Sequence, residues 1–329
     1  MSDAVRPVVT TRLDGDDGLM AGIEGSAIGD RVYRVAITAF ALCIPLLLLA
    51  IAAAIVAAAW RALARFGPDF AVSREWDPAN GIFGAAPALF GTIVTSVIAL
   101  VLATPLALGV AIFLSEFAPR RLRQPVAFLV DLLAAIPSVV YGLWGIFVLL
   151  PILRSTVMPA LASAPIVGRL PFFQGPAYGQ SILAAGIVLA IMVLPYISAV
   201  SREVLMAVPR SQREAALALG ATRWEAIRDA VLPFARSGIV GAIILGLGRA
   251  LGETMAVTMV IGNRHDISAS LFSPGYTLAS LIANEFAEAT GDMHLSALMA
   301  AGALLFAVTL IVNAVARWLV WRVAREQGA

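Results

Sequence analysis

Two opposite charges stand four residues apart in an otherwise apolar stretch, and these residues could bind an ion. The stretch Leu245–Val260 reads LGLGRALGETMAVTMV, with Arg249 and Glu253 as its charged residues. This spacing places both side chains on one face of a continuous helix, where they can pair. Arginine can also bind an oxyanion, because its planar guanidinium matches two oxygens and keeps its charge. Two hypotheses follow: a structural ion pair, or an anion-binding arginine on a translocation path.

A second informative segment, Pro209–Pro233, reads PRSQREAALALGATRWEAIRDAVLP. Two capping boxes, Ser211–Glu214 and Thr222–Glu225, predict two helix starts. Gly220 between them predicts the turn that ends the first helix. The segment is therefore expected to fold as helix, glycine turn, helix. Its small alanines favour contact with a partner protein, and the alternative is an amphipathic helix that anchors the chain in lipid headgroups.

The composition excludes a soluble protein. Of 329 residues, 60% are hydrophobic and 13% are charged, against about 25% charged in soluble domains. All 23 basic residues are arginine, so the chain has no P-loop lysine, and they form no single stripe of the kind that binds nucleic acid. One cysteine and two distant histidines, His265 and His294, predict neither a disulfide nor a metal site. We expect no catalytic site and no cofactor in this chain, so a partner must supply any ATP chemistry.

Six apolar stretches are each long enough to cross a hydrocarbon core, which needs about 20 helical residues. They are Ala36–Trp60, Ala88–Leu114, Val126–Leu153, Ser181–Val208, Phe234–Gly262 and Leu295–Val320. Sixteen arginines fall on one side of these spans and six on the other, which places both termini and residues 209–233 in the cytoplasm. Residues 1–30 lack periodicity and predict a disordered tail before a membrane domain at 31–325. The expected fold is an all-α, multi-pass transmembrane bundle.

The cytoplasmic segment resembles the EAA signature of ABC-importer permeases. Glu214–Ala216, then Gly220, then Leu232-Pro233 match its spacing, with Ala230 where the signature has isoleucine. The resemblance implies a MetI-like fold. It also implies a coupling helix that sits in a cleft of a cytoplasmic ATPase subunit, and that subunit binds ATP and Mg. The residues implied in this coupling are Glu214, Ala215, Ala216 and Gly220.

Two further blocks resemble the permeases of phosphate importers, of the PstC type: residues 135–145 (AIPSVVYGLWG) and 248–263 (GRALGETMAVTMVIGN). The resemblance implies a non-enzymatic subunit that carries inorganic phosphate into a bacterial cytoplasm, with Arg249 and Glu253 on the substrate pathway. Glu253 would neutralise Arg249 between turnovers or accept a hydrogen bond from a protonated phosphate.

The same resemblance implies three partners in the inner membrane and at its surfaces. They are a second permease of the PstA type, two copies of the ATPase subunit and an extracytoplasmic phosphate-binding protein. Gly241, Gly246, Gly248 and Gly252 lie along one helix, with a GxxxG step at Gly248–Gly252. Small residues favour close packing against another permease subunit, and the alternative is that they leave space for an ion. The alternatives are a permease for molybdate, tungstate or sulfate and an ion-coupled carrier acting alone.

Overall fold

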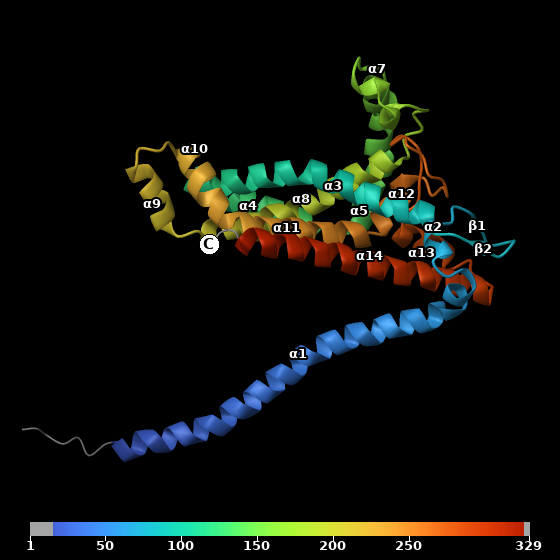
Figure 1. The fold of residues 1–329 in the computed structure, drawn as a ribbon. Helices are drawn as coiled ribbons and strands as arrows, with labels where there is room; N and C mark the ends of the chain where they lie inside the picture. The colour runs from blue at the N-terminus through green and yellow to red at the C-terminus, as the bar shows by residue number, and fades with distance from the viewer. Residues whose placement is uncertain (1–15, 326–329) are drawn as a thin grey trace, which may run out of the picture. The chain divides into compact units, whose positions relative to one another are not determined.

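The computed structural model describes residues 16–325 of the chain (Figure 1). The chain forms two compact units, one ending at Ala54 and the other beginning at Ile55. The first helix, α1 (Asp16–Phe66), has residues in both units. Residues 16–30 of the predicted disordered tail are therefore helical, and residues 1–15 lie outside the described chain. The helix extends upstream because no proline precedes Pro45 in this stretch, which leads directly into the first apolar span.

Six helices of the described chain are long and apolar enough to cross a membrane, which confirms the predicted number. They are Gly29–Phe66, Ala86–Phe117, Ser138–Ser163, Ile182–Ala207, Arg223–Gly252 and Asp292–Arg322. The shortest has 26 residues, more than the roughly 20 that a hydrocarbon core requires. The protein is therefore an all-α membrane bundle with one small hairpin.

The hairpin consists of β1 (Trp76–Asp77) and β2 (Ile82–Phe83), which pair antiparallel. The α-helices after α1 are α2 (Asp69–Val72), α3 (Ala86–Ile112), α4 (Arg120–Ala134), α5 (Ser138–Trp144), α6 (Leu150–Ile152), α7 (Met158–Ser163), α8 (Ile182–Ala207), α9 (Arg210–Ala218), α10 (Arg223–Ala226), α11 (Leu232–Gly252), α12 (Met255–Ile261), α13 (Leu278–Glu285) and α14 (Asp292–Arg325). Single π-helical turns are η1 (Phe113–Phe117), η2 (Gly145–Leu149), η3 (Leu153–Val157) and η6 (Ile227–Val231), and 3₁₀ turns are η4 (Val167–Arg169) and η5 (Pro171–Phe173).

Helix α8 is the centre of the second unit. Of its most apolar stretch 72% is buried, against 28% or less in each other span. Helices α3, α4, α11 and α12 pack against it (Figure 1). Two glycines allow the close approach: a Cβ at Gly186 would lie 2.5 Å from Ile98 of α3, and one at Gly246 of α11 would lie 2.7 Å from Ile197 of α8. The position of α11 is therefore set by α8.

The third span begins later than the sequence predicts. The predicted span Val126–Leu153 is wrong at its start, because α4 ends at Ala134 and the spanning helix begins at Ser138. Pro137 causes the break, since it disfavours helical geometry at the residue before it and cannot donate to the helix. Asp131, on α4, instead forms a 3.5 Å ion pair with Arg202 of α8. Helix α4 is thus a separate element beside α8.

Candidate functional site

The fifth apolar stretch is interrupted inside the bundle. Helix α11 ends at Gly252, Glu253 has an extended backbone (φ −72°, ψ 129°), and α12 begins two residues later. The predicted continuous span Phe234–Gly262 is therefore wrong at this point. Two features accompany the interruption. Gly252 is a poor helix former. Helix α12 packs separately against α5, where a Cβ at Gly142 would lie 3.2 Å from Ala256 Cα.

This break separates Arg249 from Glu253. Arg249 lies in the last turn of α11, whereas Glu253 lies beyond its end. The Glu253 carboxylate accepts a 3.4 Å hydrogen bond from the backbone N–H of Ala256 at the start of α12. In the described chain Arg249 and Glu253 form no ion pair with each other. The pairing inferred from their spacing needs a continuous helix, and the break removes it.

The Arg249 side chain instead lies over an aromatic ring. Its Cζ is 4.4 Å from the centroid of the Tyr196 ring of α8, a cation–π contact. The Nε–H of Arg249 is buried and has no hydrogen-bond partner in the structure. An unpaired buried donor costs about 1–3 kcal/mol. Arg249 therefore keeps hydrogen-bonding capacity that the described chain does not use.

Two tyrosine hydroxyls connect this site to the end of α4. Tyr196 donates to the carbonyl of Ala134 at 3.1 Å, and Tyr141 of α5 donates to the carbonyl of Leu133 at 2.8 Å. The last carbonyls of a helix lack partners within that helix. The Leu133 carbonyl also accepts from the Ile136 N–H at 3.3 Å, and the two hydroxyls add side-chain donors at this helix end. The sequence analysis missed Tyr196, because nothing local to it indicates a contact with α4 or α11.

A cavity of about 1010 Å³ lies beside Arg249 and Tyr196, and α14 adds Arg317 to its wall. Gly241 and Gly248 of α11 also line this cavity, and a Cβ at either would meet no atom within 4 Å. Of the predicted glycines of α11, Gly241, Gly248 and Gly252 are thus left without packing partners in the described chain, whereas Gly246 packs against α8. The cavity therefore leaves open space beside Arg249 in the described chain.

The cytoplasmic segment folds as helix, glycine turn, helix, as predicted. Helix α9 ends in a Schellman motif: Ala221 N–H donates to Ala216 O at 3.2 Å, and Gly220 N–H donates to Leu217 O at 3.0 Å. Gly220 has φ +89°, a conformation that glycine adopts without steric cost. The sharp turn positions α10 directly after α9.

One of the two predicted capping boxes is present. Thr222 N–H donates to the Glu225 carboxylate at 2.7 Å, and Glu225 N–H donates to the Thr222 hydroxyl at 3.3 Å. The box predicted at Ser211–Glu214 does not form. Helix α9 has Pro209 at its N-cap, so Ser211 lies inside the first turn rather than before it.

The residues that match the coupling signature form an exposed surface. Glu214, Ala215 and Gly220 are exposed, Ala216 is half-buried, and α9 buries none of its residues. Leu219 at its end is 90% exposed. An exposed leucine beside exposed alanines is typical of a surface that meets a protein.

Sequence reasoning also missed Arg213, which points the other way. Its guanidinium forms a 2.7 Å ion pair with Glu116 of η1. The two residues are 97 positions apart, so neither the capping pattern nor the signature reveals their contact.

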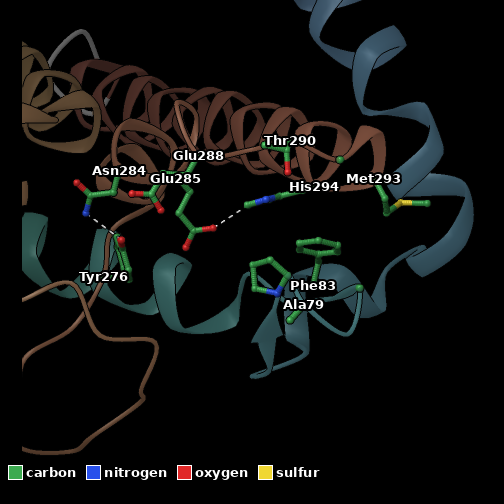
Figure 2. Close-up of a pocket in the computed structure, with 12 residues that line it drawn as sticks. Ala79, Phe83, Tyr276, Asn284, Glu285, Glu288, Thr290, Met293 and His294 are labelled. Carbon is green, nitrogen blue, oxygen red and sulfur yellow. Dashed lines mark hydrogen bonds and ion pairs between the residues drawn. The ribbon is translucent and has the colours of Figure 1, made fainter.

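A second polar cluster surrounds Glu285 at the end of α13. One carboxylate oxygen accepts from Trp76 Nε1 at 2.7 Å and lies 2.9 Å from His294 Nε2, and the other lies 3.2 Å from His265 Nε2. Figure 2 shows Glu285 and His294 in the wall of a cavity of about 790 Å³. Among the described residues, no three His, Cys, Asp or Glu side chains have the arrangement of a metal site. The sequence analysis did not foresee that one carboxylate joins both histidines.

The partners of Glu285 change its acidity. Burial by itself would raise the pKa of Glu285, but the hydrogen bonds from His265, His294 and Trp76 outweigh burial and lower this pKa. The Trp76 indole also stacks on His265, with ring centroids 5.6 Å apart. The charged carboxylate therefore holds together β1, the segment before α13, α13 itself and α14.

Comparison with known proteins identifies the family. The family described as binding-protein-dependent transport system inner membrane component matches residues 103–325. The phosphate transport system permease protein PstC of Mesorhizobium japonicum is 45% identical over 311 residues, which cover 94% of this chain and 95% of that protein. PstC of Haemophilus influenzae is 43% identical over 303 residues, 91% of this chain and 95% of its own length.

Solved structures share the fold. A subunit of the inward-facing MetNI methionine ABC transporter superposes with a TM-score of 0.54 at 18% identity, covering 72% of this chain and 94% of that chain. A chain of a bacterial ABC transporter involved in the import of alginate superposes with a TM-score of 0.51 at 20% identity, covering 72% of this chain and 78% of that chain. These likenesses concern the fold, and they agree with the predicted ABC-importer permease architecture.

Proposed function

The chain belongs to the binding-protein-dependent transport system inner membrane components, and we propose that it carries inorganic phosphate into the cytoplasm as a permease subunit of an ABC importer. It is a multi-pass membrane protein, and PstC phosphate permeases match it over more than nine-tenths of its length. The observation that carries the proposal is Arg249, a permanent cation inside a span, with an unpartnered Nε–H beside a large cavity.

The chemistry of Arg249 suits a phosphate oxyanion. A charge within a membrane span costs about 2.5–3.5 kcal/mol, so the bundle bears this cost for a ligand that offsets it. Guanidinium can donate two parallel hydrogen bonds to phosphate oxygens. Tyr196 holds the guanidinium from one side and leaves the other donors for the anion. In this proposal Glu253, across the helix break, accepts a hydrogen bond from a protonated phosphate, which fully ionised sulfate cannot donate.

The exposed surface of α9 is the proposed seat of a cytoplasmic ATPase subunit. Glu214, Ala215, Ala216 and Gly220 form the contact, and two ATPase copies serve the complete importer. The chain has no lysine, and therefore no P-loop lysine, which supports the proposal that ATP and Mg bind to the separate ATPase chain.

Two further partners complete the proposed importer. A second permease of the PstA type packs on the glycine face of α11, where Gly241 and Gly248 have open space. An extracytoplasmic phosphate-binding protein delivers phosphate at the opposite side of the membrane from α9. Both termini are cytoplasmic in this arrangement, as the excess of arginine on that side supports.

The test is phosphate uptake by cells in which this chain replaces the native permease. Arg249→Ala is expected to reduce uptake of radiolabelled phosphate about 100-fold, or about 2.7 kcal/mol, because a buried charged contact is lost. Arg264→Ala is the control, since Arg264 is exposed and pairs with Asp266. Normal uptake by an assembled Arg249→Ala importer would refute the assignment.

Selectivity is tested in the same cells by competition. Excess unlabelled phosphate is expected to suppress uptake, whereas molybdate, tungstate and sulfate are expected to leave most of it. In Glu253→Gln, sulfate is expected to compete with labelled phosphate more strongly than it does in the wild type, because an amide can donate a hydrogen bond to a fully ionised oxyanion. Equal competition by all four anions with the wild-type chain would contradict a phosphate-selective pathway.

A further inference from the structure

We propose that Arg213 is a positioning residue that transmits movement of α9 to the membrane spans α3 and α8. The inference rests on the proposed docking of an ATPase subunit on α9 and concerns how that docking reaches the spans. Arg213 is neither one of the coupling-signature residues nor one of the pathway charges.

The Arg213 guanidinium contacts two other segments besides its own helix. Its Nε and Nη2 donate to the Glu116 carboxylate, with a shortest distance of 2.7 Å. Its Nη1 donates to the carbonyl of Val208 at 2.7 Å, and its Nη2 donates to that of Leu205 at 2.8 Å. Glu116 lies in η1, which continues α3, and Leu205 lies in the last turn of α8. One side chain of α9 therefore holds the ends of two spans.

The hydrogen bonds between Arg213 and Glu116 join two charged groups that are mostly shielded from solvent. The side chains of Arg213 and Glu116 are only 22% and 12% exposed, and hydrogen bonds between charged partners are stronger than neutral ones. The Leu205 carbonyl also accepts a longer hydrogen bond of 3.4 Å from the Val208 N–H, so Arg213 adds a shorter, charged donor at the end of α8. Arginine keeps its charge at every physiological pH, which makes the link permanent.

Helix α9 has little else to hold it to these spans. None of its residues is buried, and its other main neighbours are α10 and η6 of the same cytoplasmic segment. Successive helical residues point about 100° apart. Arg213 can therefore point to α3 and α8 while the next residue, Glu214, is exposed on the docking surface.

The link continues to the proposed phosphate site through one rigid element. Leu205, whose carbonyl Arg213 binds, and Tyr196, whose ring lies against Arg249, are both on α8. A displacement of α9 that pulls on the end of α8 therefore moves the ring that holds Arg249. A continuous chain of packed and hydrogen-bonded groups of this kind can carry coupling between distant sites.

The experiment measures phosphate transported per ATP hydrolysed by the complete importer in proteoliposomes, with its binding protein, ATP and phosphate. The variants are Arg213→Ala, Arg213→Lys and Glu116→Gln. The matched control is Arg228→Ala, which removes an exposed arginine–aspartate pair in the same segment. We expect Arg213→Ala and Glu116→Gln to retain the ATPase subunits and to transport at least fivefold less phosphate per ATP. Arg213→Lys should lose less, because it keeps the charge, and the control should match wild type.

The outcomes separate the two proposals. If the wild-type complex purifies without an ATPase subunit, the docking on α9 fails and this inference fails with it. If the ATPase docks but the ratio of phosphate to ATP is unchanged in the variants, only the role of Arg213 is overturned. Phosphate transport and ATP hydrolysis could fall in proportion, or the ATPase could be lost from the variants alone. Either result would show that Arg213 only stabilises the structure and would overturn its role in transmitting movement. If the Arg213→Ala importer does not assemble, the role of Arg213 is tested with Glu116→Gln alone, which keeps the size of the side chain.

Discussion

Glu285 and Arg249 show two ways of holding a charge in a largely apolar helical protein. The Glu285 carboxylate has an indole and two imidazoles within hydrogen-bonding distance, spread over both oxygens. Arg249 rests against the ring of Tyr196 and keeps a buried Nε–H without a partner. Both oxygens of the Glu285 carboxylate therefore have partners within the described chain, although the buried Nδ1 of its partner His265 has none, whereas the Nε–H of Arg249 has no partner and Arg249 lines a cavity.

The difference indicates which charge serves structure and which serves a ligand. A buried polar group that is fully paired contributes to stability, while an unpaired one costs free energy until something binds it. Substitution at Glu285 should therefore change stability more than transport, and substitution at Arg249 should do the reverse.

The largest expected effect is on stability. Glu285→Ala should lower the free energy of unfolding by about 2–4 kcal/mol, because the Trp76 indole and two histidines lose their common acceptor. The melting temperature of the purified protein in detergent measures this. Glu288→Ala is the control, since Glu288 is exposed in the wall of the same cavity. Equal melting temperatures for the two variants would show that the hydrogen bonds of Glu285 do not stabilise the fold.

The next effect concerns transport. Arg249→Lys keeps the positive charge but loses the planar fork, so phosphate uptake should fall about tenfold, or about 1.4 kcal/mol. Its melting temperature should stay at the wild-type value, because Arg249 makes no ion pair in the described chain. A clear drop in melting temperature would show that Arg249, like Glu285, stabilises the fold.

Tyr196 allows a smaller and more selective test. Tyr196→Phe removes the hydroxyl that binds the Ala134 carbonyl and should cost about 1 kcal/mol of stability. The ring remains against Arg249, so uptake should change little. Tyr196→Leu removes the ring as well and should reduce uptake further, since the cation–π contact contributes about 0.5–2 kcal/mol. Equal uptake by the two variants would show that the ring does not position Arg249.

Acidification should give the smallest effect. The pKa of Glu285 is lowered from its usual value of 4.5 in the folded protein. Its contribution to stability is therefore complete above that value and is lost as pH falls through the lower folded pKa. The melting temperature of the wild type should fall more over this acidic range than that of Glu285→Gln, which cannot titrate. Parallel curves for both proteins would contradict the lowered pKa.

Local rules predicted the cytoplasmic segment well. The Gly220 turn and the Thr222–Glu225 capping box depend on hydrogen bonds between residues at most five positions apart. Such bonds are specified by neighbouring residue types. The prediction failed at Ser211, where Pro209 starts the helix before the serine can cap it.

The sequence by itself determined the membrane class, the number of spans and the helix–turn–helix segment, because hydrophobic length and capping act within one stretch of chain. It also placed Arg249 inside a span. Only the tertiary structure decided that α11 ends before Glu253, that Tyr196 lies against Arg249, and that Trp76 meets Glu285 across 209 positions. Those outcomes depend on how α8, α12 and α13 pack against distant elements, and no local pattern of residues encodes that packing.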